Sequence, residues 1–337
     1  MRCSARQGAD GGSDPAGDTH RIAHFVNTLY IISYPRSGST LFGMLLGQHD
    51  GCVFVGEVSA VFTSSWDRNC GCTSHPPTHV RDCAFWGPIL DKVQTTLDEA
   101  GIGNREIGGV SEEWRGKILR EAALELRTSG GVPRTAPVRG LVKSVRQLYK
   151  HFELKGGNVL IVDSSKGITY AYVLSLIMGG GVRFLHMVRD PRGVVFSSRR
   201  KPSDAGSDKP LSTYRAGRVA AGWLARNLAI ELFTSATPQQ ATRLRYEDFC
   251  DRPRETVMDI LETYGLEPGV GGFVSSDAVV LDPNHAFRAN RLRHSEGPLS
   301  ISADTKWRTG MEATYKAIAT SCSAPLRLRY GYRAPRD

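Results

Sequence analysis

Short apolar runs alternate with helical patterns along this chain, and the first clear pair lies near its beginning. Leu29–Ser33 is an apolar run of strand length, and Leu41–Leu46 has the apolar face of a helix. Between them, Pro35 and Gly38 mark a tight turn. This pattern predicts a buried strand, a loop, and a helix that begins directly after the loop.

The same order of strand, turn and helix recurs further along. Cys52–Val55 and Val182–Val188 are apolar runs of strand length. After the second run, Asp190 is a favoured helix N-cap, and Pro191 suits the first helical position because its missing N–H has no partner there. The alternation predicts a three-layer α/β domain with a central, mainly parallel sheet flanked by helices.

The first turn is suited to an anion. The N-terminus of a helix offers unpaired backbone N–H groups and the positive end of the helix dipole. Arg36 adds a fixed charge, and Ser37, Ser39 and Thr40 add hydroxyl groups around Gly38. A Walker loop has lysine directly after its second glycine, whereas Ser39 stands there in this chain. An ordinary strand-turn-helix connection with a surface arginine is the alternative.

Residues 35–40 resemble the 5′-phosphosulfate loop of sulfotransferases that use 3′-phosphoadenosine 5′-phosphosulfate (PAPS). Arg189 at a strand end, with Ser197 eight positions later, is similar to the family's 3′-phosphate motif. An arginine fork can donate two hydrogen bonds to one phosphate. The resemblance extends from about Leu29 to Tyr332. The motifs are most similar to those of bacterial small-molecule or glycan enzymes and of tyrosylprotein sulfotransferases. It implies a P-loop-like sulfotransferase fold, PAPS as co-substrate, an acceptor with a hydroxyl group, and no metal ion in the transfer step.

The resemblance also implies a set of catalytic residues. Tyrosylprotein sulfotransferases use the glutamate of a Gly-Glu pair as base, and Glu57 matches it. Lys166 matches the lysine that approaches the bridging oxygen of the donor, and Arg36 the cation of the loop. Asp163 is expected directly after another strand and is the alternative base. A carboxylate that caps the following helix is the other interpretation of Asp163. A surface or helix-start carboxylate and a solvated lysine are the alternatives for Glu57 and Lys166.

Three further residues are expected near the nucleotide. Tyr246 resembles a tyrosine that contacts the adenosine in tyrosylprotein enzymes, although a buried core tyrosine would have the same pattern. Arg293 and Lys306 are expected as second phosphate or lid contacts. The family usually has glycine where Ala289 stands in this chain, so the turn there differs from the family pattern.

The apolar pattern also divides the chain. The first 25 or so residues have no apolar period and predict a disordered tail. Residues 26–337 then form a single sulfotransferase domain, in which residues 65–158 exceed what a strand-helix-strand crossover needs and predict a largely helical, substrate-side insertion. The sequence contains neither an apolar run of membrane-spanning length nor the apolar core of a signal peptide. A soluble, cytoplasmic protein is therefore expected.

The net charge of +9 fits a ligand with several negative charges. Nucleic acid is an unlikely partner, because no recognisable nucleic-acid module accompanies the basic residues. Two other functions stay open: a nucleotide-dependent kinase or phosphotransferase, and a non-catalytic nucleotide- or RNA-binding protein. The pattern does not choose among small-molecule, glycan, lipid and tyrosine hydroxyl groups, and it gives no oligomeric state.

Three of the seven cysteines lie close together in the predicted insertion. Cys70, Cys72 and Cys83 would form a Cys₃His zinc set with His75 or His79. Their spacing is not that of a standard zinc signature, so a disulfide and free thiols are alternatives. The odd number of cysteines favours free thiols in a reducing compartment.

Overall fold

A five-stranded parallel sheet lies at the centre of the protein. The computed structural model describes residues 27–64, 66–72, 78–103, 112–156, 160–198, 213–267, 269, 271–287 and 297–333. The strand order is β2-β3-β1-β4-β5, and all neighbouring strands are parallel. The strands are β1 Thr28–Ser33, β2 Cys52–Gly56, β3 Leu160–Lys166, β4 Val182–Val188 and β5 Ala241–Arg245. A small antiparallel sheet pairs β6 Ala278–Val280 with β7 Pro298–Ser300.

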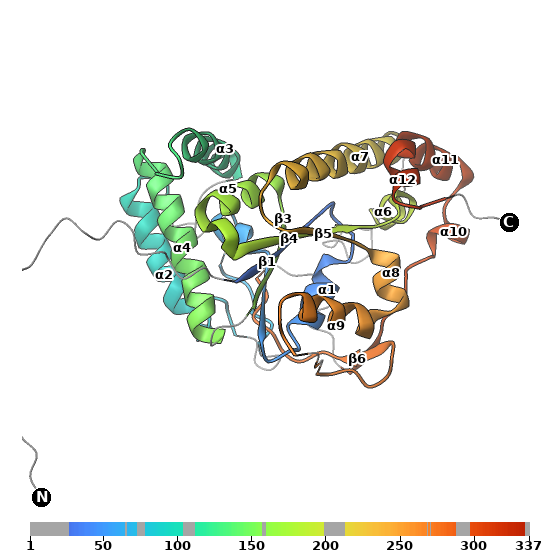
Figure 1. Ribbon diagram of the computed structural model, residues 1–337, viewed down its shortest axis with the longest axis horizontal. Coiled ribbons are helices and arrows are strands. Elements are labelled where there is room, and N and C mark those ends of the chain that lie inside the picture. Colours follow the sequence, from blue (N-terminus) through green and yellow to red (C-terminus); the bar gives the residue numbers. More distant parts are fainter. Residues whose placement is uncertain are drawn as a thin grey trace, which may run out of the picture.

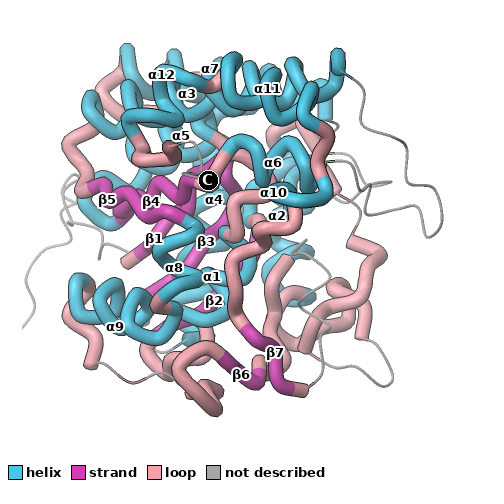
Figure 2. Tube along the Cα trace, turned by 90° about the vertical axis from the view of Figure 1, so that its right-hand side faces the viewer, coloured by secondary structure: helices cyan, strands magenta, loops and turns pink. Residues whose placement is uncertain are grey.

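Helices cover both faces of the central sheet (Figures 1 and 2), with α5 and α7 on one side and α1 and α9 on the other. In chain order the helices are α1 Ser39–Leu46, α2 Gly87–Glu99, α3 Glu112–Thr128, α4 Ala136–Gly156, α5 Ile168–Met178, α6 Pro191–Ser197, α7 Thr213–Ala236, α8 Tyr246–Asp251, α9 Pro253–Thr263, α10 Trp307–Gly310, α11 Ala313–Cys322 and α12 Ala324–Arg329. Two 3₁₀ helices are η1 Val58–Phe62 and η2 Gly179–Gly181. The three-layer α/β prediction is therefore confirmed.

The side chains of β1 show why the sheet is covered on both faces. Tyr30 and Ile32 belong to the core that includes α2, α4 and α5, whereas Leu29 and Ile31 belong to the core that includes α1, α8 and α9. All four are buried. Because successive strand residues point to opposite faces, a continuous apolar run is what a central parallel strand requires.

Most of the predicted elements are confirmed, and one placement is wrong. The strands expected in the first part of the chain and before Arg189 are β1, β2 and β4, and Asp190 caps α6 by accepting a hydrogen bond from the Arg192 N–H. The sequence places Asp163 after a strand, but it lies within β3. That strand continues to Lys166, because Lys166 still pairs with Ile32 of β1.

Much of the predicted insertion is helical. Helices α2, α3 and α4 lie together at one end of the molecule (Figure 1), where α4 packs against both α2 and α3. Helix α4 also contacts β2 and β3, and Trp66 and Trp86 are buried in the same core. The predicted insertion is thus packed onto the sheet. Within the described ranges, no helix combines the length and the apolar character needed to cross a membrane.

Candidate active site at the carboxyl edge of the sheet

Each of the five strands leads to one residue that the sequence singles out. Arg36 follows β1 after a short turn, Glu57 and Arg189 come directly after β2 and β4, Lys166 ends β3, and Tyr246 comes directly after β5. Since the strands are parallel, their carboxyl ends lie at one edge of the sheet. In open α/β sheets this edge is where ligands bind.

The loop after β1 has unusual backbone geometry. Arg36 has a φ of 72° and Gly38 a φ of 88°, both in the left-handed region. A Cβ atom on Gly38 would lie 2.5 Å from the Tyr246 ring, so only glycine fits there. Gly38 is also the N-cap of α1, and no side chain caps that helix. The loop thus leads into a helix N-terminus that no side chain caps, and such N-termini bind anions.

Strain at the site extends to a second residue. Among the described residues, Arg36 and Lys166 are the non-glycine residues with positive φ, and Lys166 has a φ of 67°. A left-handed conformation costs a residue with a Cβ atom roughly 1–2 kcal/mol. Such conformations concentrate at ligand-binding and catalytic positions. Both strained positions are residues for which the sequence predicts a catalytic role.

Arg189 connects the loop to a late segment of the chain. Its guanidinium group, only 8% exposed, donates to the backbone oxygen of Arg36 at 3.0 Å and to Oδ2 of Asp304 at 3.3 Å. It also lies 4.5 Å from the centre of the Tyr246 ring. Arg36 Nη2 in turn donates to the backbone oxygen of Ser197 at 3.1 Å. The structure thus brings Arg36, Arg189 and Ser197 together.

The hydroxyl groups of this region are mostly engaged in local contacts. Ser37 Oγ donates to the Tyr34 backbone oxygen at 2.8 Å, and Ser197 Oγ to the Val194 backbone oxygen at 2.9 Å. Ser39 and Thr40 are buried in the first turn of α1. The backbone N–H groups of the loop are therefore better placed than the Ser37 hydroxyl to meet a ligand.

Tyr246 lies beneath the loop as a buried residue. Its hydroxyl donates to the Ser302 backbone oxygen at 3.4 Å and accepts from the Asp304 N–H at 3.3 Å. Burial raises the pKa of this hydroxyl to about 12. Lys306 is exposed at the start of α10, and its N–H donates to Asp304 Oδ1 at 3.3 Å. Arg293 lies outside the described residues.

Glu57 and Lys166 form an ion pair between adjacent strand ends. Lys166 Nζ lies 2.5 Å from Glu57 Oε1, and the two side chains are 16% and 26% exposed, respectively. Glu57 does not cap η1 with its side chain. Its N–H donates to the Phe287 backbone oxygen at 2.8 Å, and Arg226 Nη1 donates to the Lys166 backbone oxygen at 3.4 Å. Both charged groups are held at the sheet edge and remain partly accessible.

Asp163, the alternative base, is completely buried. Its Oδ1 accepts from the Ser165 N–H at 2.8 Å and from Ser165 Oγ at 2.5 Å, while Oδ2 accepts from the Tyr149 hydroxyl at 2.5 Å. Burial raises its pKa to about 6, against the lowering effect of these hydrogen bonds. Ser165 Oγ also accepts from the Ser59 N–H at 2.9 Å. Asp163 therefore ties β3 to the segment that follows Glu57, and it does not cap α5.

Among the cavities that the described residues form, two of different size bear on the site. One of about 180 Å³ adjoins Asp304 and is lined largely by charged side chains, among them Arg192, Arg245 and Glu247. A larger one, about 620 Å³, lies along α2 and α4 and includes none of the residues predicted for the site. The smaller cavity is thus the one adjacent to the Arg189 region.

Sequence reasoning misses three partners of the predicted residues. Asp304 lies two residues before Lys306, which the sequence does single out, but its pairing with Arg189 joins positions 115 residues apart. The backbone of Phe287 and the side chain of Arg226, which contact Glu57 and Lys166, have no motif of their own. Within the described part of the chain, the one group of side chains spaced like a metal-ligand set includes neither Glu57 nor Lys166.

One segment of the chain matches a known family. Residues 180–268 match the sulfotransferase family. The matched segment contains β4, Arg189, Ser197, β5 and Tyr246, so it confirms the resemblance to sulfotransferases. Arg36, Glu57 and Lys166 lie outside the matched segment. No curated protein matches the chain.

Solved sulfotransferases give weaker likenesses. The sulfotransferase domain of the olefin synthase from Synechococcus PCC 7002 is 18% identical, with 92% of this chain and 96% of that chain covered and a TM-score of 0.45. The sulfotransferase domain from the curacin biosynthetic pathway is 18% identical, with 92% and 99% covered and a TM-score of 0.45. A sulfotransferase from Alicyclobacillus acidocaldarius is 10% identical, with 89% and 95% covered and a TM-score of 0.41.

Proposed function

We propose that this chain transfers a sulfuryl group from PAPS to the hydroxyl group of an acceptor. The family match over residues 180–268 supports sulfuryl transfer in general. The observation that carries the proposal further is the arrangement at the sheet edge. Five strand ends each supply one residue that the sulfotransferase resemblance predicts, and two of these, Arg36 and Lys166, have strained backbones.

The donor would bind along the β1 and β4 side of the edge. Arg36 and the N–H groups of residues 37–40 would hold the 5′-phosphosulfate, and Arg189 with Ser197 the 3′-phosphate. The uncapped N-terminus of α1 and the buried guanidinium group of Arg189 fit anionic ligands. Asp304 would compete with the 3′-phosphate for Arg189, because its carboxylate already accepts from that guanidinium group.

The chemistry would take place on the β2 and β3 side. Glu57 would accept the proton of the acceptor hydroxyl while the acceptor oxygen forms a bond to sulfur. The bond between sulfur and the bridging oxygen of the donor breaks, and its electron pair leaves with 3′-phosphoadenosine 5′-phosphate. Lys166 would stabilise the charge on that oxygen. These roles need a base and a cation at one place, which the 2.5 Å ion pair supports.

Glu57 is a better candidate for the base than Asp163. The Glu57 side chain is 26% exposed, whereas Asp163 is buried and both its oxygens already accept hydrogen bonds. A base must reach the proton that it removes, directly or through one water molecule. Asp163 has no such access, so we assign it a positioning role.

The remaining predictions for the whole protein belong to the same proposal. A single domain from residue 26 onward, with residues 65–158 lying on the substrate side, would leave acceptor choice to the insertion. A cytoplasmic location would suit a nucleotide co-substrate. The acceptor would be a small molecule, glycan, lipid or tyrosine, because the proposed base and cation require only a hydroxyl group.

Product formation tests the proposal. The purified protein is incubated with PAPS and a panel of hydroxyl acceptors, and both sulfated product and 3′-phosphoadenosine 5′-phosphate are measured by mass spectrometry. We expect the two products in equal amounts, without added Mg²⁺, and their loss in Glu57→Gln. ATP-dependent phosphorylation of an acceptor, with no sulfated product, would contradict the proposal and favour a kinase.

A further inference from the structure

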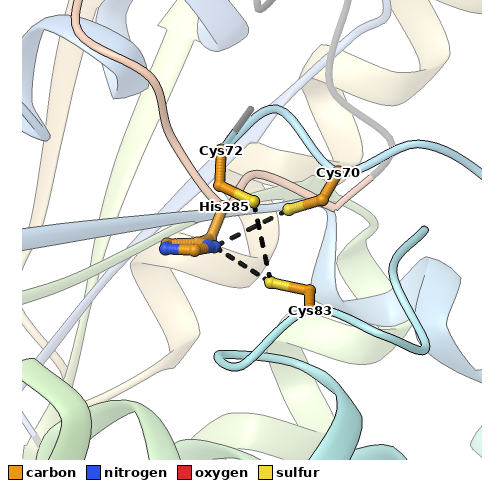
Figure 3. A group of neighbouring side chains, drawn as sticks. All are labelled: Cys70, Cys72, Cys83 and His285. Atoms are coloured by element: carbon orange, nitrogen blue, oxygen red, sulfur yellow. Dashed lines mark hydrogen bonds between the residues drawn. The ribbon is translucent and has the colours of Figure 1, made fainter. Parts of the chain in front are cut away.

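Three cysteines and one histidine converge outside the proposed active site (Figure 3). The Sγ atoms of Cys70, Cys72 and Cys83 and a ring nitrogen of His285 all lie within 4.8 Å of one another. Cys72 Sγ lies 3.8 Å from Cys83 Sγ, and His285 Nδ1 lies 3.6 Å from Cys70 Sγ and 3.3 Å from Cys83 Sγ. All three cysteines are free thiols.

These separations match a tetrahedral zinc site. Zinc binds thiolate sulfur at about 2.3 Å and imidazole nitrogen at about 2.0–2.1 Å. Tetrahedral angles then place two sulfur ligands about 3.8 Å apart, and a sulfur and a nitrogen ligand about 3.5 Å apart. The three distances given above agree with these two values to within a few tenths of an ångström. All six separations between the four ligand atoms are at most 4.8 Å, so the atoms already surround a position that one ion could occupy.

The backbone holds the cysteines on a small turn structure. The Cys70 N–H donates to the Thr78 oxygen at 2.8 Å, and the Val80 N–H donates to the Arg68 oxygen at 2.8 Å. These hydrogen bonds flank an antiparallel bridge between Asn69 and His79, and Cys70 and Cys72 follow directly after Asn69. Cys83 lies just before α2, and its backbone oxygen accepts from the Gly87 N–H at 2.8 Å.

His285 reaches the cluster from a distant part of the sequence. Its ring stacks on Phe85 with 4.5 Å between ring centres and 12° between the planes. Its backbone oxygen accepts from Trp86 Nε1 at 2.6 Å, and the neighbouring Asn284 N–H donates to the Gly71 oxygen at 3.2 Å. These contacts orient the imidazole and its segment without using the ring nitrogen that faces the sulfurs.

We propose that Cys70, Cys72, Cys83 and His285 bind one structural Zn²⁺ ion. Four protein ligands fill the tetrahedral positions and leave none for water or substrate, as in structural rather than catalytic zinc sites. Binding displaces the thiol protons, because the ligands are thiolates. The sequence suggests His75 or His79 as the fourth ligand. His79 instead forms a backbone bridge with Asn69 and is not part of the cluster, and His75 lies outside the described residues.

The ion would connect the predicted insertion to the strand end that precedes Glu57. Two residues after His285, the Phe287 N–H donates to the Val55 oxygen at 3.0 Å, and the Phe287 oxygen accepts from the Glu57 N–H at 2.8 Å. A Cβ atom on Gly56 would lie 2.5 Å from the Phe287 oxygen, which shows how closely these segments pack. Zinc at the cluster therefore supports the backbone of Glu57 from a distance, and this inference does not depend on the proposed reaction.

Metal analysis of the purified full chain tests the proposal. We expect about one zinc ion per chain, retained through dialysis. Cys72→Ser and His285→Gln should lose most of that zinc, whereas Cys322→Ser, which changes an exposed cysteine outside the cluster, should keep it. A full chain without zinc, iron in its place, or equal zinc in all variants would overturn the proposal.

A second measurement uses only the wild-type protein, so it does not depend on whether the variants fold. Wild-type protein is stripped of metal with a chelator and titrated with Co²⁺. Four-coordinate Co²⁺ with three thiolates should give intense visible bands and strong sulfur-to-metal charge transfer that saturate at one equivalent, and Zn²⁺ should abolish both. The pink spectrum of six-coordinate Co²⁺ would contradict the site. A count of only five free thiols in denaturant, two fewer than the seven cysteines of the chain, would also contradict it, because it indicates a disulfide.

Discussion

The two halves of the sheet edge are built differently. On the β1 and β4 side, Arg36, Arg189 and Ser197 are linked by hydrogen bonds from arginine side chains to backbone oxygens. On the β2 and β3 side, Glu57 and Lys166 form an ion pair. The first half gathers cations beside an uncapped helix N-terminus, whereas the second places a base beside a cation. In the proposed function, the first half holds the anionic donor and the second half moves the proton of the acceptor.

Two carboxylates within the second half also differ from each other. Glu57 is partly exposed, and Asp163 on the neighbouring strand is buried among hydrogen-bond donors. The same functional group therefore has an accessible position and an inaccessible one, a few residues from each other across paired strands. Substitutions that affect one half or one carboxylate alone test whether this division is real.

The largest expected effect belongs to Glu57→Gln. Loss of a general base lowers the rate by about 10²–10⁴-fold, so we expect kcat for sulfuryl transfer to fall in that range. The affinity for 3′-phosphoadenosine 5′-phosphate should not change, because the proposed nucleotide site lies in the other half. Steady-state rates and calorimetry measure the two quantities. Glu255→Gln, at an exposed ion pair in α9, is the matched control; a Glu57→Gln enzyme with the normal rate would remove Glu57 from the mechanism.

Asp163→Asn tests the buried carboxylate through pH. The pKa of Asp163 is raised from its ordinary value of 3.8 to about 6, so the folded chain holds this proton more tightly than the unfolded chain. This proton stabilises the folded state fully below about pH 4, and the stabilisation is lost as the pH rises toward 6. Above pH 6 the contribution of Asp163 to the unfolding free energy no longer changes with pH. Wild type should therefore lose about 3 kcal/mol of unfolding free energy relative to Asp163→Asn across this window. Denaturant unfolding of both proteins at several pH values measures this difference in unfolding free energy. A difference that stays constant with pH would refute the raised pKa of Asp163.

Arg189→Ala should weaken binding of 3′-phosphoadenosine 5′-phosphate by about 10- to 100-fold, because a hydrogen bond to a charged group contributes roughly 1.5–3 kcal/mol. Binding of 5′-AMP should hardly change. Arg252→Ala, which removes the exposed arginine at the N-cap of α9, is the control. Equal loss for both ligands would show that Arg189 only supports the loop through the Arg36 oxygen.

The smallest expected effect belongs to Asp304→Asn. This change removes a negative charge beside Arg189 while keeping an oxygen that can accept from the Lys306 N–H. We expect 3′-phosphoadenosine 5′-phosphate to bind about two- to five-fold more tightly, within the range of a partly exposed ion pair. Calorimetry on the variant measures this, and weaker binding would mean that Asp304 holds Arg189 in its binding position.

Local pattern was sufficient to predict the strands and the residues that follow them. The apolar runs before Arg36, Glu57 and Arg189, and the cap at Asp190, are signals contained within a few neighbouring residues. For Asp163 the same reasoning failed, because the end of β3 is determined by pairing with β1 rather than by its own apolar run.

Contacts between distant segments could not be predicted in this way. The pairing of Arg189 with Asp304, the backbone bonds of Phe287 to the end of β2, and the approach of His285 to Cys83 join positions separated by more than a hundred residues. Neither residue of such a pair has a local pattern that names the other. The sequence thus identified three cysteines but not the histidine that completes the cluster.

The most direct test of the central claim is calorimetric binding of 3′-phosphoadenosine 5′-phosphate to the wild-type protein, beside 5′-AMP and ATP. The account predicts that the 3′-phosphate strengthens binding at least about 10-fold over 5′-AMP, with no requirement for Mg²⁺. Equal affinity for 3′-phosphoadenosine 5′-phosphate and 5′-AMP, or tight binding of ATP that needs Mg²⁺, would contradict it.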